Sequence, residues 1–353
     1  MYQGQHIIDL PKRIVVGEGV LSQLGTHFKE LFDKGGLVYV VTGQNILQLY
    51  YKKVKEMLED AGFSVTYLVT GPATVDEARR VASEAEKDRA DILMGLGGGR
   101  SIDLAKYAAA ELGKDFVSVP TSPSHDGITS PFATLRGFER PYSKLAKPPK
   151  LLLLDIDVLA SAPRRLAAAG FGDLIGKFTA VLDWRLAHRL RGEYYGAYAA
   201  SLALMSAKHV SAYARQIGAG NREGLRALVE ALVSSGVAMC IAGSSRPASG
   251  SEHLFAHALE MISQSPPLHG EAVGVGTIMM SYLHGLRWSR VRKLLKEAGA
   301  PTSAKELGVK EEEVIEALVK AASIRPERYT ILGEEGLTRE AAEELAIRTK
   351  VIK

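Results

Sequence analysis

The chain is poor in cysteine and in asparagine. Cys240 is the only cysteine among 353 residues, and Asn45 and Asn221 are the only asparagines. A single cysteine excludes an intramolecular disulfide and any metal site built from a cysteine cluster. A scarcity of asparagine is seen in heat-adapted proteins, where thermolabile amides are fewer, but composition alone leaves adaptation to heat open.

The chain also lacks a strong charge of either sign and a long apolar run. Its 44 Lys and Arg against 40 Asp and Glu give a net charge of +4, which does not indicate nucleic acid and does not oppose a phosphorylated substrate. Polar residues such as Gln3 and Asp9 stand where a signal peptide needs an apolar run. The apolar stretch 151–162 is interrupted by two aspartates and is too short to span a bilayer. We therefore expect a cytoplasmic protein with no membrane span and no nucleic-acid partner.

The composition of the chain and the order of its β-rich and helical segments predict two domains. Hydrophobic residues make up 46% and charged residues 24%, which is typical of a soluble globular protein and excludes a mainly disordered chain. Residues 1–160 alternate short β-rich runs with amphipathic stretches, the pattern of an α/β sheet. Residues 161–353 carry long segments rich in Ala, Leu, Arg and Glu. We expect an N-terminal Rossmann-like dinucleotide-binding domain and an all-helical domain for metal and substrate, with the active site in the cleft between them.

The predicted elements of the first domain alternate regularly. Strands are predicted over residues 14–16, 37–42, 65–69, 91–96 and 116–119, and helices over 20–31, 45–61, 75–87 and 101–112. Thr74, three residues before Glu77, forms a capping-box pattern at the start of the third helix. In the second domain, helical segments are predicted over 164–190, 194–216, 222–242 and 252–263.

A glycine-rich turn follows the fourth predicted strand. Three consecutive glycines at 97–99 let the backbone approach a pyrophosphate, which the N-terminus of the following helix would favour. Arg100 stands where the Rossmann fingerprint would place its third glycine, so this spacing does not establish an NAD fold. A tight turn without a ligand remains the alternative.

Two further loops carry residues that could affect the binding of a nucleotide cofactor. No carboxylate follows the second predicted strand at 42–45, where an acid would hold the ribose 2′-hydroxyl and repel a 2′-phosphate. We infer tolerance of NADP beside NAD. The loop 119–130 is dense in hydroxyls, which either cap the local backbone or donate hydrogen bonds to a cofactor, with Asp126 reaching a substrate hydroxyl.

Histidines and a carboxylate gather in the helical part of the sequence. His253 and His257 lie four residues apart and so share a helix face, His269 follows, and Asp173 stands between glycine-rich neighbours. Three ligands drawn from His and Asp, with one open position, suit a catalytic zinc, although an aspartate ligand also admits iron(II). A lone histidine on a helix is more often structural, but this grouping favours a metal site.

Five motifs, in this order over nearly the whole chain, resemble one superfamily. They are GGGRSIDLAK (97–106), PTSPSHDG (120–127), GDLIGK (172–177), SSRPASGSEH (244–253) and LHGEAVGVG (268–276). The superfamily contains iron-containing alcohol dehydrogenases, glycerol dehydrogenases and dehydroquinate synthases. Within it, the motifs are most similar to those of the sn-glycerol-1-phosphate dehydrogenases, which make the backbone of archaeal membrane phospholipids.

The resemblance implies an active site of known chemistry. Zinc, or possible iron, would be held by Asp173, His253 and His269. Lys177 stands where the iron alcohol dehydrogenases carry a histidine ligand, a departure that favours a three-ligand zinc site. Dihydroxyacetone phosphate would be reduced to sn-glycerol 1-phosphate with NAD or NADP as cofactor, and His257 would relay the proton.

The resemblance also implies the remaining site residues. The residues expected along the cofactor are Gly97, Gly98, Gly99, Arg100, Ser101, Asp103, Thr121, Ser122, Pro123, Ser124 and Ser130. Those expected at the substrate are Asp126, Asp173, His257, Lys177 and Arg246, and Asp126 and His257 are the catalytic candidates. We suspect Lys177 or Arg246 of holding the substrate phosphate.

Two alternatives stay open. A glycerol or other polyol dehydrogenase would need no phosphate on its substrate. A lyase similar to dehydroquinate synthase would use NAD and zinc and return the cofactor unchanged, but Asp173, Lys177 and the pair Asp183-Trp184 match the glycerol phosphate group better. We also expect a homo-oligomer.

Overall fold

A computed structural model describes residues 6–137 and 142–353, and the chain divides into two compact units. The α/β unit contains residues 7–123 and 127–162. The helical unit contains residues 163–353 together with His6 and the short segment 124–126. The division therefore falls two residues after the predicted boundary, and a segment that the sequence assigns to the first domain groups with the second.

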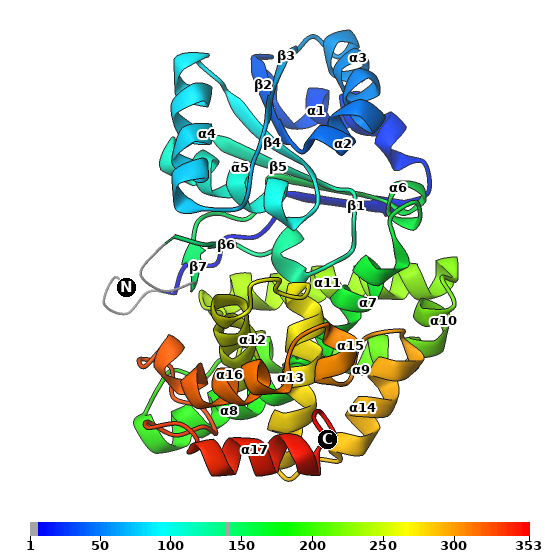
Figure 1. Cartoon of the computed structure of the whole chain (residues 1–353). Coiled ribbons are helices and arrows are strands. Elements are labelled where there is room, and N and C mark those ends of the chain that lie inside the picture. Colours follow the sequence, from blue (N-terminus) through cyan, green and yellow to red (C-terminus); the bar gives the residue numbers. More distant parts are fainter. Residues whose placement is uncertain (1–5, 138–141) are drawn as a thin grey trace. The chain divides into compact units, whose positions relative to one another are not determined.

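The α/β unit is built on a six-stranded parallel sheet in the order β1-β8-β5-β4-β2-β3 (Figure 1). Its strands are β1 (Arg13–Gly17), β2 (Leu37–Thr42), β3 (Ser64–Val69), β4 (Ile92–Gly97), β5 (Asp115–Pro120) and β8 (Leu151–Asp155). A small antiparallel pair consists of β6 (Phe132–Leu135) and β7 (Tyr142–Leu145). The five predicted strands all form. The sequence does not predict β8, because a strand buried along its whole length shows a continuous apolar run without alternation.

Helices cover both faces of this sheet. Phe28 and Leu58 pack against Val40 on one face, whereas Val81 packs with Tyr39 on the other. Neighbouring residues of one strand thus feed opposite cores, as the pleat requires. The first face carries η1 (Val20–Gln23), α1 (Leu24–Leu31) and α3 (Lys52–Asp60), and the second carries α4 (Val75–Lys87) and α5 (Gly99–Glu111). The remaining short elements are α2 (Gln44–Ile46), η2 (Leu47–Tyr51), η3 (Asp126–Ile128) and α6 (Ile156–Ala160).

The predicted capping box at the start of α4 is only half formed. Thr74 Oγ1 accepts a hydrogen bond from the Glu77 backbone N–H at 3.2 Å, as predicted. The Glu77 carboxylate does not return to Thr74. It accepts hydrogen bonds from the Gly71 N–H at 2.7 Å and from Arg80 instead, so it fixes the preceding loop.

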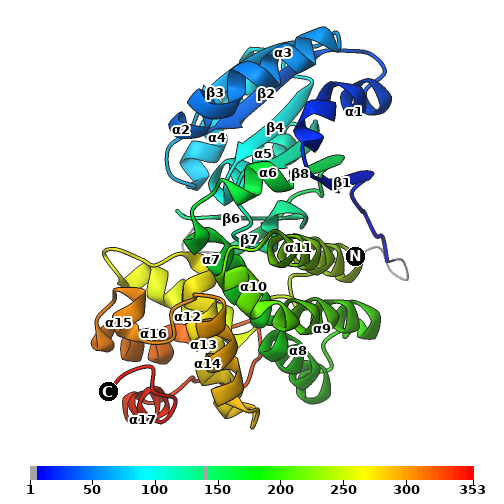
Figure 2. The same ribbon diagram turned by 90° about the vertical axis from the view of Figure 1, so that its right-hand side faces the viewer.

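The second unit is wholly helical, as the composition predicts. Its helices are α7 (Arg164–Ile175), α8 (Lys177–Arg191), α9 (Ala197–Ala212), α10 (Ala214–Gly218), α11 (Arg222–Ala242), α12 (Ser251–Ile262), α13 (His269–Leu283), α14 (Trp288–Glu297), α15 (Ala304–Leu307), α16 (Glu311–Ile324) and α17 (Arg339–Arg348). In Figure 2, α9 lies beside α8 and α11. The predicted helix 164–190 is two helices that meet at Gly176. The sequence misses α13, because its glycines suggest a turn.

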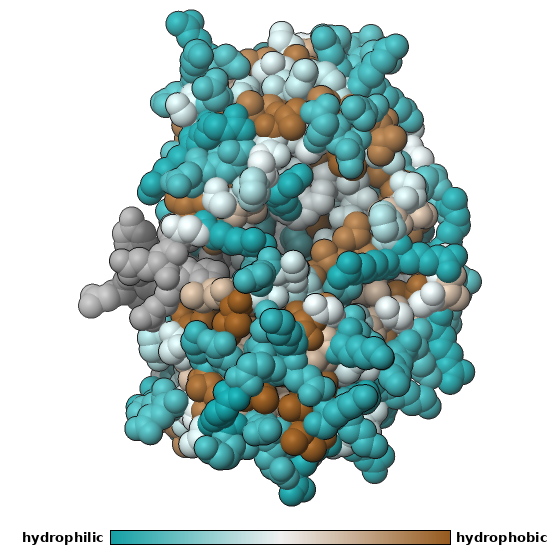
Figure 3. All heavy atoms as spheres, viewed as in Figure 1, coloured by the Kyte–Doolittle hydropathy of each residue, from teal (hydrophilic) through white to brown (hydrophobic). Residues whose placement is uncertain are grey.

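One described helix, α11, is long and apolar enough to cross a membrane by length and composition alone, with a mean hydropathy of 1.7 over its most apolar window. The apolar stretch 151–162 contains β8 and α6 instead of a membrane span. However, 67% of that α11 window is buried inside the protein, and buried core helices meet the same criterion. Hydrophilic side chains also cover most of the face drawn in Figure 3. The helix is therefore weak evidence for a membrane span.

Candidate functional site

Glycines at the crossing of α7 and α13 bring two candidate metal ligands together. A Cβ added to Gly270 would lie 1.9 Å from the carbonyl oxygen of Ala169, and one added to Gly172 would lie 2.2 Å from that of Gly270. The two helices can approach this closely only because these positions carry no side chain. Asp173 follows Gly172 and His269 precedes Gly270, so the crossing sets the carboxylate beside the imidazole.

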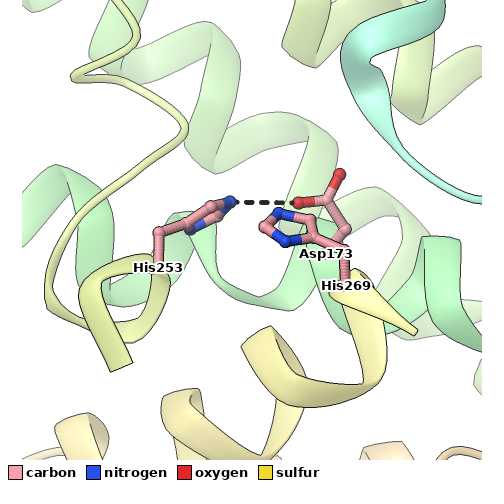
Figure 4. Close-up of side chains that lie close together, drawn as sticks. All are labelled: Asp173, His253 and His269. Atoms are coloured by element: carbon pink, nitrogen blue, oxygen red, sulfur yellow. Dashed lines mark ion pairs between the residues drawn. The ribbon is translucent and has the colours of Figure 1, made fainter. Parts of the chain in front are cut away.

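His253, from α12, completes a cluster of three with Asp173 and His269 (Figure 4). One potential ligand atom from each residue lies within 4.8 Å of the other two, and His253 Nε2 is 3.4 Å from Asp173 Oδ1. Ligands at about 2.0–2.2 Å from a tetrahedral zinc stand roughly 3.3–3.6 Å apart. The cluster therefore needs only small side-chain movements to hold one ion with an open position.

A buried carboxylate fixes the orientation of His253. Glu252 Oε1 is 2.7 Å from His253 Nδ1 and also accepts a hydrogen bond from the Gly250 N–H at 2.6 Å. Glu252 Oε2 accepts a hydrogen bond from Thr179 Oγ1 at 2.6 Å. Burial opposes ionisation of Glu252, but the hydrogen bond with His253 keeps the pKa of this carboxyl below its usual value. A carboxylate on one ring nitrogen leaves the other, Nε2, for a metal, as in many metal sites.

Two members of the cluster, His269 and Asp173, are in protonation states that suit a metal ion. Burial, followed by the charges of His253 and His257, lowers the pKa of His269 to about 3, so this imidazole is neutral. Burial alone would raise the pKa of Asp173, but the charge of Lys177 and the hydrogen bond from His253 hold it well below its usual value. A neutral imidazole and an ionised carboxylate are the forms that ligate a metal.

A buried lysine lies beside the cluster. Lys177 has no exposed side-chain surface, and its Nζ is 3.0 Å from Asp173 Oδ1 and 2.9 Å from Asp126 Oδ2. Ser235 Oγ donates a hydrogen bond to the same Asp126 oxygen at 2.7 Å, and the Asp126 N–H donates to Asp173 Oδ2 at 3.0 Å. Burial would lower the pKa of Lys177, but Asp126 and Asp173 outweigh it and raise the pKa. Lys177 therefore ties two expected site carboxylates together as a cation.

His257 lies on the other side of His269. The two ring centroids are 5.3 Å apart, and that of His257 is 6.4 Å from that of His253. His257 Nδ1 is buried without a hydrogen-bond partner, and Glu260 Oε2 is 4.0 Å away. Burial lowers the pKa of His257, which leaves it neutral. His257, Glu260 and His269 also form a second group that could hold an ion, sharing His269 with the first.

Arg246 makes contacts of a different kind. Its buried guanidinium pairs with Glu193, with Nε 2.6 Å from Oε1, and its NH2 donates a hydrogen bond to the carbonyl oxygen of Tyr329 at 2.9 Å. This arginine therefore belongs to a separate cluster of charged side chains.

The glycine-rich turn of the α/β unit lies where such sheets bind ligands. In the sheet order, β2 stands beside β4, and the helices α3 and α5 that follow these strands lie on opposite faces. Ligands of parallel sheets bind at the carboxyl ends of the strands at this switch point. Gly97 has a φ of +151°, and Gly98 caps α5, so the free N–H groups of the first turn of α5 are available to an anion.

Arg100, in the first turn of α5, extends toward the end of β2. A Cβ added to Gly43 would lie 3.0 Å from Arg100 NH2. The charge of Arg100 also contributes to lowering the pKa of Glu77. A cation thus stands near the loop where the sequence lacks an acid.

Several other residues expected at the cofactor form hydrogen bonds with other groups of the protein. Asp103 accepts hydrogen bonds from Lys106 Nζ at 3.2 Å and from the Thr134 N–H at 3.2 Å, and Ser130 Oγ bonds the backbone of Phe132. The Thr121 N–H donates to the carbonyl oxygen of Gly97 at 2.9 Å. Ser101 and Ser122 lie against the turn, since a Cβ at Gly97 or Gly98 would meet their hydroxyls. Pro123 is the last residue of the first segment of the α/β unit, and Ser124 belongs to the helical unit.

Known proteins similar to this chain agree on one family. The glycerol-1-phosphate dehydrogenase [NAD(P)+] of Aeropyrum pernix is 62% identical over the full length of both chains. That of Hyperthermus butylicus is 53% identical and covers 98% of this chain and 99% of its own. The chain belongs to the glycerol-1-phosphate dehydrogenase family. The family recognised from the motifs is thereby confirmed.

Broader comparisons find similarity over part of the chain and in the fold. The model of the iron-containing alcohol dehydrogenases matches residues 15–163. A glycerol dehydrogenase from Schizosaccharomyces pombe has a similar fold, with a TM-score of 0.80 at 21% identity, over 98% of this chain and 90% of its own. A sulfoacetaldehyde reductase from Bifidobacterium kashiwanohense in complex with NAD+ has a TM-score of 0.76 at 16% identity, over 99% of this chain and 100% of its own. The predicted fold class is confirmed.

Several residues of this candidate site are missed by sequence reasoning. Glu252 precedes His253 directly, but neighbouring helical residues do not share a face, so the spacing gave no reason to pair them. Ser235 meets Asp126 across 109 positions, which no local pattern reveals. Glu260 follows His257 by three residues, and this helical spacing is the one sequence signal that could have placed the two side chains together.

Proposed function

We propose that the protein is an NAD(P)-dependent sn-glycerol-1-phosphate dehydrogenase that interconverts dihydroxyacetone phosphate and sn-glycerol 1-phosphate for archaeal-type phospholipid backbones. One observation carries the proposal: Asp173, His253 and His269 converge into a three-ligand cluster in a chain 62% identical to a protein of that name. The reaction is reversible, and it consumes one hydride from the reduced cofactor and one proton for each ketone reduced.

The donor set fits a divalent metal, and we assign zinc. Two imidazoles and one carboxylate leave a fourth position open, as in catalytic zinc sites. Lys177 is a cation paired with Asp126 and with the cluster's own Asp173, so it adds no fourth ligand. When bound, the metal supplies Lewis-acid polarisation of a carbonyl group, and the reduced nicotinamide supplies the hydride.

The residues around the cluster handle the substrate and its proton. His257 is neutral and its Nδ1 has no hydrogen-bond partner, so it can carry a proton to or from the substrate oxygen near neutral pH. Asp126 binds a substrate hydroxyl, while Lys177 and Ser235 hold its carboxylate in one orientation. Glu252 keeps His253 in the tautomer that points Nε2 toward the metal.

The cofactor binds at the carboxyl ends of β2 and β4. The first turn of α5, from Gly99 to Asp103, binds the pyrophosphate through its N–H groups, and the guanidinium of Arg100 donates hydrogen bonds to a 2′-phosphate, so both NAD and NADP serve. The loop 121–124 and Ser130 complete this site. We assign the enzyme to the cytosol, as a homo-oligomer that acts on a small molecule and binds no nucleic acid.

The proposal is tested by offering two ketones to zinc-reloaded protein. Oxidation of NADH and NADPH is followed with dihydroxyacetone phosphate and, in parallel, with dihydroxyacetone. We expect a much higher kcat/KM for the phosphate ester. Equal or better rates with plain dihydroxyacetone would make the protein a glycerol dehydrogenase. No oxidation by metal-replete protein would overturn the dehydrogenase function and favour a lyase.

A further inference from the structure

Three arginines lie where hydrogen bonds join two segments of the helical unit that are far apart in the sequence, 244–250 and 325–329. Arg246, in the segment 244–250, donates a hydrogen bond to the carbonyl oxygen of Tyr329 at 2.9 Å. In return, Arg328 donates hydrogen bonds to the carbonyl oxygen of Ser249 at 2.7 Å and to Ser245 Oγ at 2.8 Å. Arg325 lies at the end of α16, three residues before Arg328. These reciprocal contacts hold the guanidinium groups of Arg246 and Arg328 in place, and the charge of Arg325 is close enough to affect Arg328. The three residues are here called the arginine cluster (Arg246, Arg325 and Arg328).

The arginines of the cluster repel one another. Two of them have ion pairs: Glu193 pairs with Arg246, and Glu327 pairs with Arg325 at 3.2 Å. Burial, followed by the charges of Arg325 and Arg246, lowers the pKa of Arg328 well below its usual range. Cations that repel one another at a partly buried place are stabilised by an added anion.

One guanidinium nitrogen of the cluster has no partner. Arg246 is 3% exposed, and its NH1 is buried without a hydrogen bond, whereas its Nε and NH2 are engaged. Buried donors in folded proteins are nearly always satisfied, so an unpaired one points to a missing acceptor. Glu327 is 67% exposed, so its ion pair with Arg325 is weak.

Lys177, the other candidate for a phosphate, is already committed. It has no exposed surface, and two carboxylates lie within 3.0 Å of its Nζ. A phosphate there would face Asp126 and Asp173 as well as the lysine, and two negative charges would outweigh one positive charge. Lys177 therefore neutralises these two carboxylates and does not bind the phosphate.

The arginine cluster lies near the proposed proton relay. The helix α16, which ends just before Arg325, packs along α12, which carries His253 and His257. The charge of Arg325 is close enough to contribute to lowering the pKa of His257. A short substrate with its carbonyl at the metal cluster can therefore extend past His257 toward Arg325.

We propose that the arginine cluster binds the phosphate group of the substrate, with Arg246 NH1 and the guanidinium of Arg325 as the donors and Arg328 as the residue that positions them. This inference rests on the proposed function. Arginine is suited to this role, because its planar guanidinium offers two donors to a phosphate at once. The site would thus select a phosphorylated ketone over its unphosphorylated analogue.

The test uses Arg325→Gln and Arg246→Gln in the zinc-loaded enzyme, with Arg339→Gln as the matched control. Arg339 pairs with Glu312 on the exposed surface of the same unit. A lost hydrogen bond to a charged group predicts an increase of about 10- to 100-fold in KM for dihydroxyacetone phosphate. The KM for dihydroxyacetone should stay unchanged in both variants, and Arg325→Lys should recover part of the loss.

A second readout does not depend on turnover. Inorganic phosphate should inhibit the wild type competitively with dihydroxyacetone phosphate and should raise its melting temperature, and both effects should weaken in Arg325→Gln but not in Arg339→Gln. Arg325 is only partly buried, so this variant remains informative if Arg246→Gln does not fold. A wild-type KM for dihydroxyacetone phosphate in folded Arg325→Gln and Arg246→Gln would overturn the inference. A wild type that does not reduce dihydroxyacetone phosphate would instead overturn the proposed function.

Discussion

Replacing Glu252 by Gln removes the charge that orients His253 while keeping the size of the side chain. The carboxylate lies 2.7 Å from His253 Nδ1 and accepts two further hydrogen bonds, from Gly250 and Thr179. A hydrogen bond that involves a charged group contributes about 1.5–3 kcal/mol, and Gln keeps one acceptor oxygen, so we expect the lower part of that range. A loss of about 1.5–2.5 kcal/mol corresponds to metal binding weakened about 10- to 70-fold, as for other partners of metal-bound histidines.

The assay for Glu252→Gln is a metal-binding competition against a chelator of known affinity, read together with a thermal melt of the metal-free protein. Thr179→Val is the graded control, because it removes one donor to Glu252 without touching His253. It should weaken metal binding only a few-fold. Unchanged metal affinity in folded Glu252→Gln would refute the orienting role of this carboxylate.

Four further substitutions probe the ligands, the helix crossing and the cofactor site. His257→Ala should lower kcat and leave the metal content near that of the wild type, whereas His269→Ala should release the metal; equal metal loss in both would show that the ligand assignment is wrong. Gly270→Ala sets a methyl group 1.9 Å from the Ala169 carbonyl oxygen, so chemical denaturation should show a loss of about 1–3 kcal/mol together with weaker metal binding. Wild-type stability would contradict the close crossing. Arg100→Ala should raise KM for NADPH more than KM for NADH, and equal changes would argue against a 2′-phosphate contact.

The fold was largely predictable from local patterns. Strands such as 37–42 and helices such as 75–87 and 222–242 appear with the predicted bounds, because their apolar periodicity and caps are strong. β8 was missed because its run of leucines shows no alternation. α13 was missed because glycine lowers helix propensity, although here glycine serves the crossing with α7.

The metal-binding residues of the site were predictable from the sequence, but the contacts that hold them in place were less so. Residue types and spacing indicated a metal site among Asp173, His253, His257 and His269, and the family resemblance implied the three ligands Asp173, His253 and His269, which the structure brings together. The sequence could not reveal that Lys177 would bridge two carboxylates, because one of them lies 51 positions away in a separate loop. Side-chain pairing across such distances is decided by packing, which no local pattern encodes.

The handedness of the product tests the central claim most directly. Dihydroxyacetone phosphate is reduced to completion with the zinc-loaded enzyme and NADH, and the glycerol phosphate formed is offered to a dehydrogenase specific for sn-glycerol 3-phosphate. The account predicts a product that this second enzyme leaves untouched and that the present enzyme oxidises back to the ketone. Full oxidation by the 3-phosphate enzyme would contradict the assignment as an sn-glycerol-1-phosphate dehydrogenase.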